Sequence, residues 1–200
     1  MSTTTGGDGV LLICGSRKPA PGEDKPSAAR QFLVVVGEAL REAGVTHESI
    51  DLHDLELPHF DGRAAPEYGC ADLDRAEAGV RRSRLLVVSV PAYWGGPAGV
   101  VKNFLDLLGG AAYDHPPDQP LPLLGKTVAL LVVGSDTDAA YAAHIFMRHA
   151  LTSMGAWVAP RAEVVGNPRL IRKIDVLLAS LRDFGGYVAE LSRAEAAVRR

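Results

Sequence analysis

The chain has 200 residues, 47% hydrophobic and 22% charged, an average globular composition that excludes wholesale disorder, collagen and coiled coil. Its 21 basic and 24 acidic side chains give a formal charge of −3, without the basic excess typical of nucleic-acid-binding proteins. The two cysteines, Cys14 and Cys70, form no CxxC pair, which argues against a disulfide framework or a zinc site and fits a reducing cytoplasm.

Residues 1–9 (MSTTTGGDG) lack the basic region of a secretory signal and are expected to be a disordered tail. Residues 10–200 are expected to form one domain. The longest apolar runs, such as 85–90, are too short to span a bilayer. We therefore expect a cytoplasmic protein that binds neither a membrane nor nucleic acid.

Short, continuous apolar runs alternate with longer amphipathic segments along the chain. Such runs predict strands buried on both faces, and the segments between them predict helices. In chain order the expected elements are strand 10–14, helix 28–43 with Ser27 as N-cap, strand 45–52, helix 71–82, strand 85–90, helix 97–108, strand 127–133, helix 139–154, strand 156–159 with 163–165 as an alternative continuation, and helix 170–198 with a candidate break at Gly185 and Gly186.

This alternation predicts an α/β fold with helices on both faces of a parallel sheet. Five strands suit a flavodoxin-like three-layer sandwich with a five-stranded parallel sheet in the order 2-1-3-4-5. Ligands bind such sheets beyond the carboxyl ends of the strands, where the strand order reverses. The loops expected to form a site are therefore 15–27, 91–96 and 134–138.

The first of these loops has the chemistry of an anion site. Gly15 allows a tight turn after a buried strand, and the next helix offers free N–H groups at its N-terminus. Ser16 and Ser27 add hydroxyl groups, and Arg17 and Lys18 add positive charge. The loop suits a phosphate but matches neither a dinucleotide fingerprint nor a P-loop. A solvated loop without a ligand is the alternative.

The second loop combines small residues with two aromatic rings. Glycine and alanine let a flat ligand approach the backbone, and the two rings offer faces for stacking. The alternative is a surface turn whose aromatic rings pack into the core or an oligomer interface. The candidate site residues here are Pro91, Ala92, Tyr93, Trp94, Gly95 and Gly96.

Together these motifs resemble the NADPH-dependent FMN reductase family of flavodoxin-like flavoproteins. The family's first loop reads roughly GSxRxxS, and its second reads PxYxGxxPxxLKNxxD. Here GSR at 15–17 leads to Ser27 across a longer gap, and PAYWGGP at 91–97 runs into KNFLD at 102–106. The segments LGKTVAL at 124–130 and MGAWVAP at 154–160 are also similar.

The resemblance implies bound FMN that takes a hydride from NADPH or NADH and passes electrons to a small-molecule acceptor such as a flavin or a quinone. It implies that Ser16, Arg17 and Ser27 hold the FMN phosphate, with Lys18 as a rival to Arg17. Residues 91–96 would border the isoalloxazine ring. A flavodoxin-type electron carrier and an oxidoreductase for a bulky metabolite are the alternative functions.

The resemblance also implies that the third loop closes over the polar edge of the flavin ring, through Gly134, Ser135 and Asp136. Either Asp136 or Asp138 then lies near the ring, or Asp138 caps the following helix while Asp136 pairs with Arg148.

Family members are usually homodimers or homotetramers, and 53–68 and 109–124 are the expected interface or lid. His144 and His149, five residues apart on one predicted helix, are poorly spaced to share a metal, so no metal site is expected.

Overall fold

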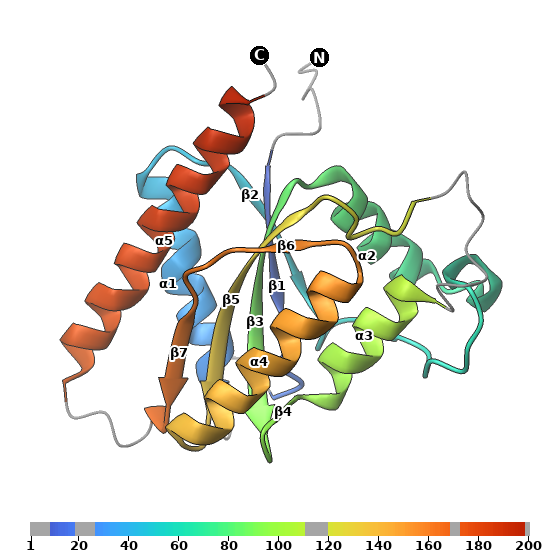
Figure 1. Ribbon diagram of the computed structural model, residues 1–200, viewed down its shortest axis with the longest axis horizontal. Helices are drawn as coiled ribbons and strands as arrows, with labels where there is room; N and C mark the ends of the chain where they lie inside the picture. The colour runs from blue at the N-terminus through green and yellow to red at the C-terminus, as the bar shows by residue number, and fades with distance from the viewer. Residues whose placement is uncertain (1–8, 19–26, 111–119, 169–172, 199–200) are drawn as a thin grey trace.

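A computed structural model describes residues 9–18, 27–110, 120–168 and 173–198. Within these ranges a parallel sheet lies between two layers of helices (Figure 1). The expected N-terminal tail lies outside the described residues, apart from Gly9. No helix in the described ranges is long and apolar enough to cross a membrane.

The sheet runs in the order β2-β1-β3-β5-β6, with β7 also paired to β5. Every pairing along this path is parallel, and β1 and β5 are buried along their whole length. The predicted order 2-1-3-4-5 is therefore confirmed, with β6 and β7 sharing the fifth position. The strands are β1 Val10–Cys14, β2 His47–Asp51, β3 Leu85–Tyr93, β5 Thr127–Gly134, β6 Trp157–Val158 and β7 Glu163–Gly166.

Each face of the sheet packs against its own set of helices. Helices α1 and α5 cover the face that presents Leu12 and Leu131, and α2, α3 and α4 cover the face that presents Ile13 and Leu130. Alternate residues of one strand thus enter different cores, as the period-two geometry of a strand requires. The helices are α1 Ala28–Glu42, the short 3₁₀ turn η1 Ala65–Tyr68, α2 Ala71–Arg82, α3 Gly99–Gly109, α4 Thr137–Ser153 and α5 Ile174–Ala197.

The second loop is a hairpin, which corrects the expectation of a plain loop at 91–96 followed by a helix from Pro97. Strand β3 continues to Tyr93, and the two-residue strand β4, Gly96–Pro97, pairs back on it antiparallel. Trp94 and Gly95 connect the two strands with φ angles of 54° and 79°. Positive φ at both central residues is what a type I′ turn needs.

Helix α5 is unbroken, which corrects the expected interruption at Gly185 and Gly186. A Cβ atom at Gly185 would lie 2.6 Å from the Cβ of Ala39 and 3.2 Å from the carbonyl oxygen of Val36, both on α1. A Cβ at Gly186 would meet nothing within 4 Å. Gly185 therefore allows the close approach of α5 to α1, whereas Gly186 has no packing role.

These adjacent glycines predict opposite effects of the same substitution. Gly185→Ala should destabilise the fold by about 1–3 kcal/mol, because the new methyl group must push α1 and α5 apart. Gly186→Ala should stabilise it by up to about 1 kcal/mol, since alanine favours a helix interior. Thermal or denaturant unfolding of the two variants measures both. If both substitutions change the free energy of unfolding equally, α5 does not pack closely on α1 at Gly185.

Candidate functional site

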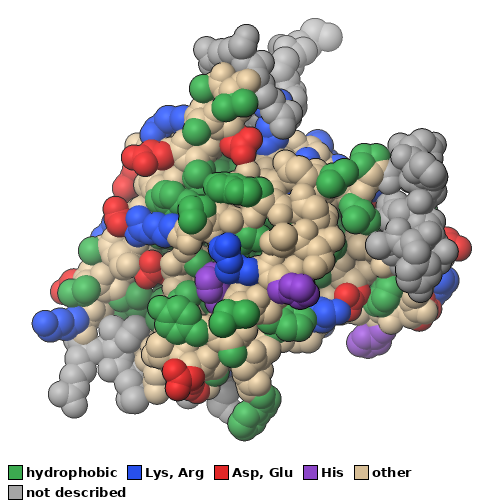
Figure 2. All heavy atoms as spheres, in the orientation of Figure 1, with side chains coloured by type: hydrophobic (Ala, Val, Ile, Leu, Met, Phe, Trp, Pro, Cys, Tyr) green, Lys and Arg blue, Asp and Glu red, His purple; other side chains and the backbone are tan. Residues whose placement is uncertain are grey.

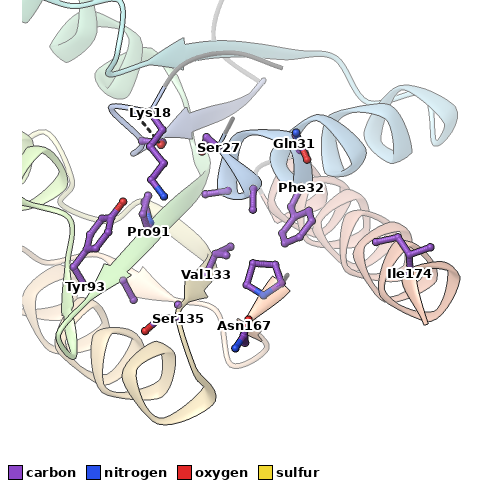
Figure 3. A pocket seen from close by; sticks show the side chains of 16 residues that line it. Lys18, Ser27, Gln31, Phe32, Pro91, Tyr93, Val133, Ser135, Asn167 and Ile174 are labelled. Atoms are coloured by element: carbon purple, nitrogen blue, oxygen red, sulfur yellow. Dashed lines mark hydrogen bonds between the residues drawn. The ribbon is translucent and has the colours of Figure 1, made fainter. Parts of the chain in front are cut away.

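A cavity of about 680 Å³ opens at the carboxyl edge of the sheet, where the three candidate loops meet (Figure 3). Such a position, beside the point where strand order reverses, is where ligands bind in open α/β sheets. Eight of the residues singled out in the sequence line this cavity: Ser16, Lys18, Ser27, Pro91, Ala92, Tyr93, Gly134 and Ser135.

The first loop begins at a close contact between β1 and β3. The N–H of Gly15 donates to the carbonyl oxygen of Ser89 at 2.8 Å, and a Cβ at Gly15 would lie 2.6 Å from that oxygen. The buried hydroxyl of Ser89 in turn donates to the carbonyl oxygen of Ala29, at 2.8 Å. The first loop and the start of α1 are thereby both anchored to β3.

The N-terminus of α1 faces the cavity, as predicted for an anion site. Ser27 is confirmed as the N-cap, and its hydroxyl accepts from the N–H of Arg30 at 3.1 Å. Ala28 and Ala29 line the cavity, and their N–H groups have no acceptor among the described residues. A helix N-terminus with free N–H groups attracts negative charge. Ser16, 2% exposed, adds a hydroxyl at the same end.

The two consecutive cations of the first loop point to different places. The guanidinium of Arg17 donates to the carbonyl oxygens of Leu52, His53 and Leu55, at 3.1, 3.4 and 3.2 Å. It lines a separate groove of about 790 Å³ beside segment 53–60 and α3. Lys18 lies at the cavity, where its ammonium group is 5.9 Å from the centre of the Tyr93 ring (Figure 3). Of these two cations, Lys18 is therefore the one that faces the cavity.

The hairpin forms one wall of the cavity and its rim. Pro91, Ala92 and Tyr93 line the cavity, and the Tyr93 side chain is half exposed. Trp94 and Gly95 occupy the turn at the tip instead, and the Trp94 side chain is fully exposed. Neither they nor Gly96 lines the cavity.

Asp136 caps α4, so the alternative in which Asp138 caps this helix and Asp136 pairs with Arg148 is wrong. One carboxylate oxygen of Asp136 accepts from the N–H of Ala139 at 2.7 Å, and the other accepts from the hydroxyl of Ser135 at 3.0 Å. The hydrogen bond from Ala139 lowers the pKa of Asp136 below its ordinary value. Arg148 donates to the carbonyl oxygen of Ala159 instead.

The sequence did not point to the cavity residues of three places: the first turns of α1, the segment after β7 and the start of α5. Gln31 and Phe32 face the cavity from the first turns of α1, and Asn167 and Pro168 follow β7 directly. The helix start at Ser27 could have indicated the first pair. The alternative strand at 163–165 could have indicated the second, because it carries the next residues to the carboxyl edge of the sheet. Ile174, at the start of α5, had no comparable signal.

Residues 9–168 match the family model of NADPH-dependent FMN reductase. The chain belongs to the NADPH-dependent FMN reductase family. It is therefore a flavin oxidoreductase with FMN as its cofactor and NADPH or NADH as co-substrate, as the sequence motifs predicted. No curated protein matches the chain.

Solved structures with low sequence identity share the fold of this FMN reductase family member. FerB, a flavoenzyme NAD(P)H:(acceptor) oxidoreductase from Paracoccus denitrificans, has a TM-score of 0.69 at 17% identity, over 94% of this chain and 98% of FerB. The apo form of the NADH:FMN oxidoreductase EMOB has a TM-score of 0.63 at 19% identity, over 88% of this chain and 87% of EMOB. An azoreductase from Bacillus anthracis has a TM-score of 0.62 at 18% identity, over 90% of this chain and 97% of the azoreductase.

The residues at the cavity fit FMN. Its volume of about 680 Å³ lies within the roughly 300–1,000 Å³ of small-molecule sites. One end offers Ser16, Lys18 and the free N–H groups of α1, which suit a phosphate dianion. The remaining wall combines extended backbone at 91–93 with small side chains at 133–135, which leaves room for a flat ring.

Proposed function

We propose that this protein oxidises NADPH or NADH and passes the electrons through FMN to a small-molecule acceptor in the cytoplasm, with residues 10–200 acting as one domain. The observation that carries the proposal is the cavity, which has an anion-binding end on α1 and a flat wall on β3 and β5. The chain that forms this cavity belongs to the FMN reductase family. FMN, when bound, supplies the hydride chemistry, and the protein supplies orientation and surroundings.

In this proposal the FMN phosphate binds where the first loop meets α1. The N–H groups of Ala28 and Ala29 and the hydroxyl of Ser16 donate to its oxygens. Lys18 contributes the charge, since Arg17 is engaged with three backbone carbonyls on the other side of the loop. Charge-assisted hydrogen bonds of this kind are about twice as strong as neutral ones.

The flavin ring then lies against β3 and β5. Pro91 and Ala92 border it with backbone and small side chains, and Gly134 and Ser135 approach its polar edge. Asp136 does not line the cavity in this arrangement, and its carboxylate accepts from Ala139 and Ser135. Tyr93 covers the outer side, where nicotinamide and acceptor would enter in turn.

The defining experiment is the visible spectrum of the purified protein before and after NADPH or NADH is added without oxygen. We expect a yellow protein with bound FMN. Its absorbance near 450 nm should be lost when NADPH or NADH reduces the flavin and should return when a quinone or free flavin is added. An electron carrier without nicotinamide turnover would not show this cycle. A protein that binds no flavin, or whose bound flavin is not reduced by either nicotinamide, would contradict the proposal.

The positions of Lys18 and Arg17 predict unequal losses of FMN affinity. Lys18→Ala should raise the Kd for FMN about tenfold or more, because a charge-assisted contact with the phosphate is lost. Arg17→Ala should change it by less than about threefold, because the Arg17 guanidinium lies away from the cavity and Arg30 still holds the carbonyls of Ser16 and Lys18. Titration of each apoprotein with FMN measures the difference, and a larger loss in Arg17→Ala would make Arg17 the phosphate ligand.

We also propose that the protein is a homodimer or homotetramer. The expected interface at 109–124 lies largely outside the described residues, but α4 offers a further surface. Its outer face exposes apolar side chains beside the hairpin (Figure 2): Tyr141, Ile145 and Phe146 on α4 and Trp94 at the tip. Two such helices packed antiparallel would place Asp138, in the first turn, against the Arg148 end of the partner.

Light scattering tests this assembly. The unmodified protein should have at least twice the mass of one chain, and Ile145→Asp should dissociate it by placing charges in an apolar contact. Val34→Asp, at an exposed position on α1, is the matched control and should leave the mass unchanged. A monomeric unmodified protein at micromolar concentration would contradict the proposal.

A further inference from the structure

Arg30 is a largely buried cation close to the cavity that does not line it. It lies in the first turn of α1, three residues after the N-cap, and its side chain is 12% exposed. A charged group with so little contact with water must be paired and hydrogen-bonded within the protein. Its partners therefore show what it does.

The first partner of Arg30 is Asp51, the last residue of β2. The guanidinium Nε and Nη2 atoms donate to the two carboxylate oxygens at 2.5 and 3.1 Å, which is a bidentate arrangement. The Asp51 side chain is 21% exposed, so solvent screens this pair much less than a surface ion pair. Asp51 also accepts from the N–H of His53 at 3.0 Å.

The second partner is the backbone of the first loop. The Nη1 atom of Arg30 donates to the carbonyl oxygen of Lys18 at 2.6 Å, and Nη2 donates to that of Ser16 at 3.4 Å. A trans peptide is planar with its N–H opposite its C=O, so the held Ser16 carbonyl also fixes where the N–H of Arg17 points. The Lys18 carbonyl precedes Pro19, which has no N–H. Arg30 thus holds one peptide carbonyl on each side of the Arg17–Lys18 pair.

The end of β2 and the first loop are tied together by a second, reciprocal set of bonds. Arg17 donates to carbonyl oxygens at 52, 53 and 55, and Nδ1 of His53 lies 3.0 Å from the carbonyl oxygen of Arg17. These bonds hold the Arg17 side chain away from the cavity. The residue that remains on the cavity side is Lys18.

We propose that Arg30, held by Asp51, is a positioning residue that sets the affinity of the first loop for the FMN phosphate without touching it. It does so by fixing the Ser16 and Lys18 carbonyls, so that the hydroxyl of Ser16 and the ammonium of Lys18 face the cavity. This inference rests on the proposed function, because it assigns the positioned loop to the phosphate of FMN.

The test compares FMN with riboflavin, which has the same ring but no phosphate. Binding of both to the apoproteins of Arg30→Gln and Asp51→Asn is measured by quenching of flavin fluorescence. Each variant should weaken FMN at least tenfold and riboflavin less than threefold, because only the phosphate-binding loop is released. Arg30→Lys should fall between Arg30→Gln and the unmodified protein, since one ammonium cannot hold a carboxylate and two carbonyls in the geometry of a guanidinium.

Arg63→Gln is the matched control. Arg63 forms a bidentate pair with Asp61, but this pair is half exposed and lines neither the cavity nor the neighbouring groove. Its removal should leave the affinities for FMN and riboflavin unchanged. If Arg30→Gln does not fold, Asp51→Asn, which keeps the size of the side chain, decides the question.

The outcomes separate this inference from the proposed function. If the unmodified protein binds FMN and the Arg30 and Asp51 variants lose FMN and riboflavin in equal proportion, or lose neither, then Arg30 is merely structural and the inference is overturned. If the unmodified protein binds neither flavin, the proposed function itself fails. A loss of discrimination between FMN and riboflavin, confined to these variants, supports the inference.

Discussion

The site depends on the close pairing of β1 with β3 at the point where the strand order reverses. The register places Cys14 beside Ser89, and the chain can continue past this pair only because Gly15 has no side chain. Ser89 then accepts from the N–H of Gly15 and donates to the carbonyl oxygen of Ala29. One buried serine thus holds the first loop and the start of α1 against the strand that supplies the opposite wall.

Because the first loop and the start of α1 are anchored in this way, their charged groups meet at one end of the cavity, which is the proposed anion-binding end. The first turn of α1 contains no acidic residue, so no carboxylate within that turn offsets the positive end of the helix dipole. Arg30 adds a cation there, but Asp51 balances it, and the carbonyl oxygens of Ser16 and Lys18 also accept from it. Among the described residues of the first loop, Lys18 is the cation that lines the cavity. The carboxylate of Asp136 does not line it and caps α4 instead.

The fold and the position of the cavity were largely predictable from the chain. The strands at 10–14 and 127–133 and the N-cap at Ser27 were confirmed within a residue or two, because burial on both faces leaves an uninterrupted apolar run and capping leaves a local pattern. The hairpin at 91–97 was missed, because Pro91 and Pro97 suggested a loop and a helix start. Strand β4 is two residues long and pairs with the end of β3, so it forms only when the chain turns back on itself.

By itself, the sequence determined the layered α/β fold, the edge of the sheet at which the cavity opens and the family to which the chain belongs. These follow from local burial patterns and short motifs. Only the tertiary structure decided which of two neighbouring cations faces the cavity and which carboxylate caps α4. The orientation of Arg17 depends on carbonyls about 35 residues away, at the end of β2. Contacts between segments so distant in the chain arise only when the sheet has formed, and no local pattern encodes them.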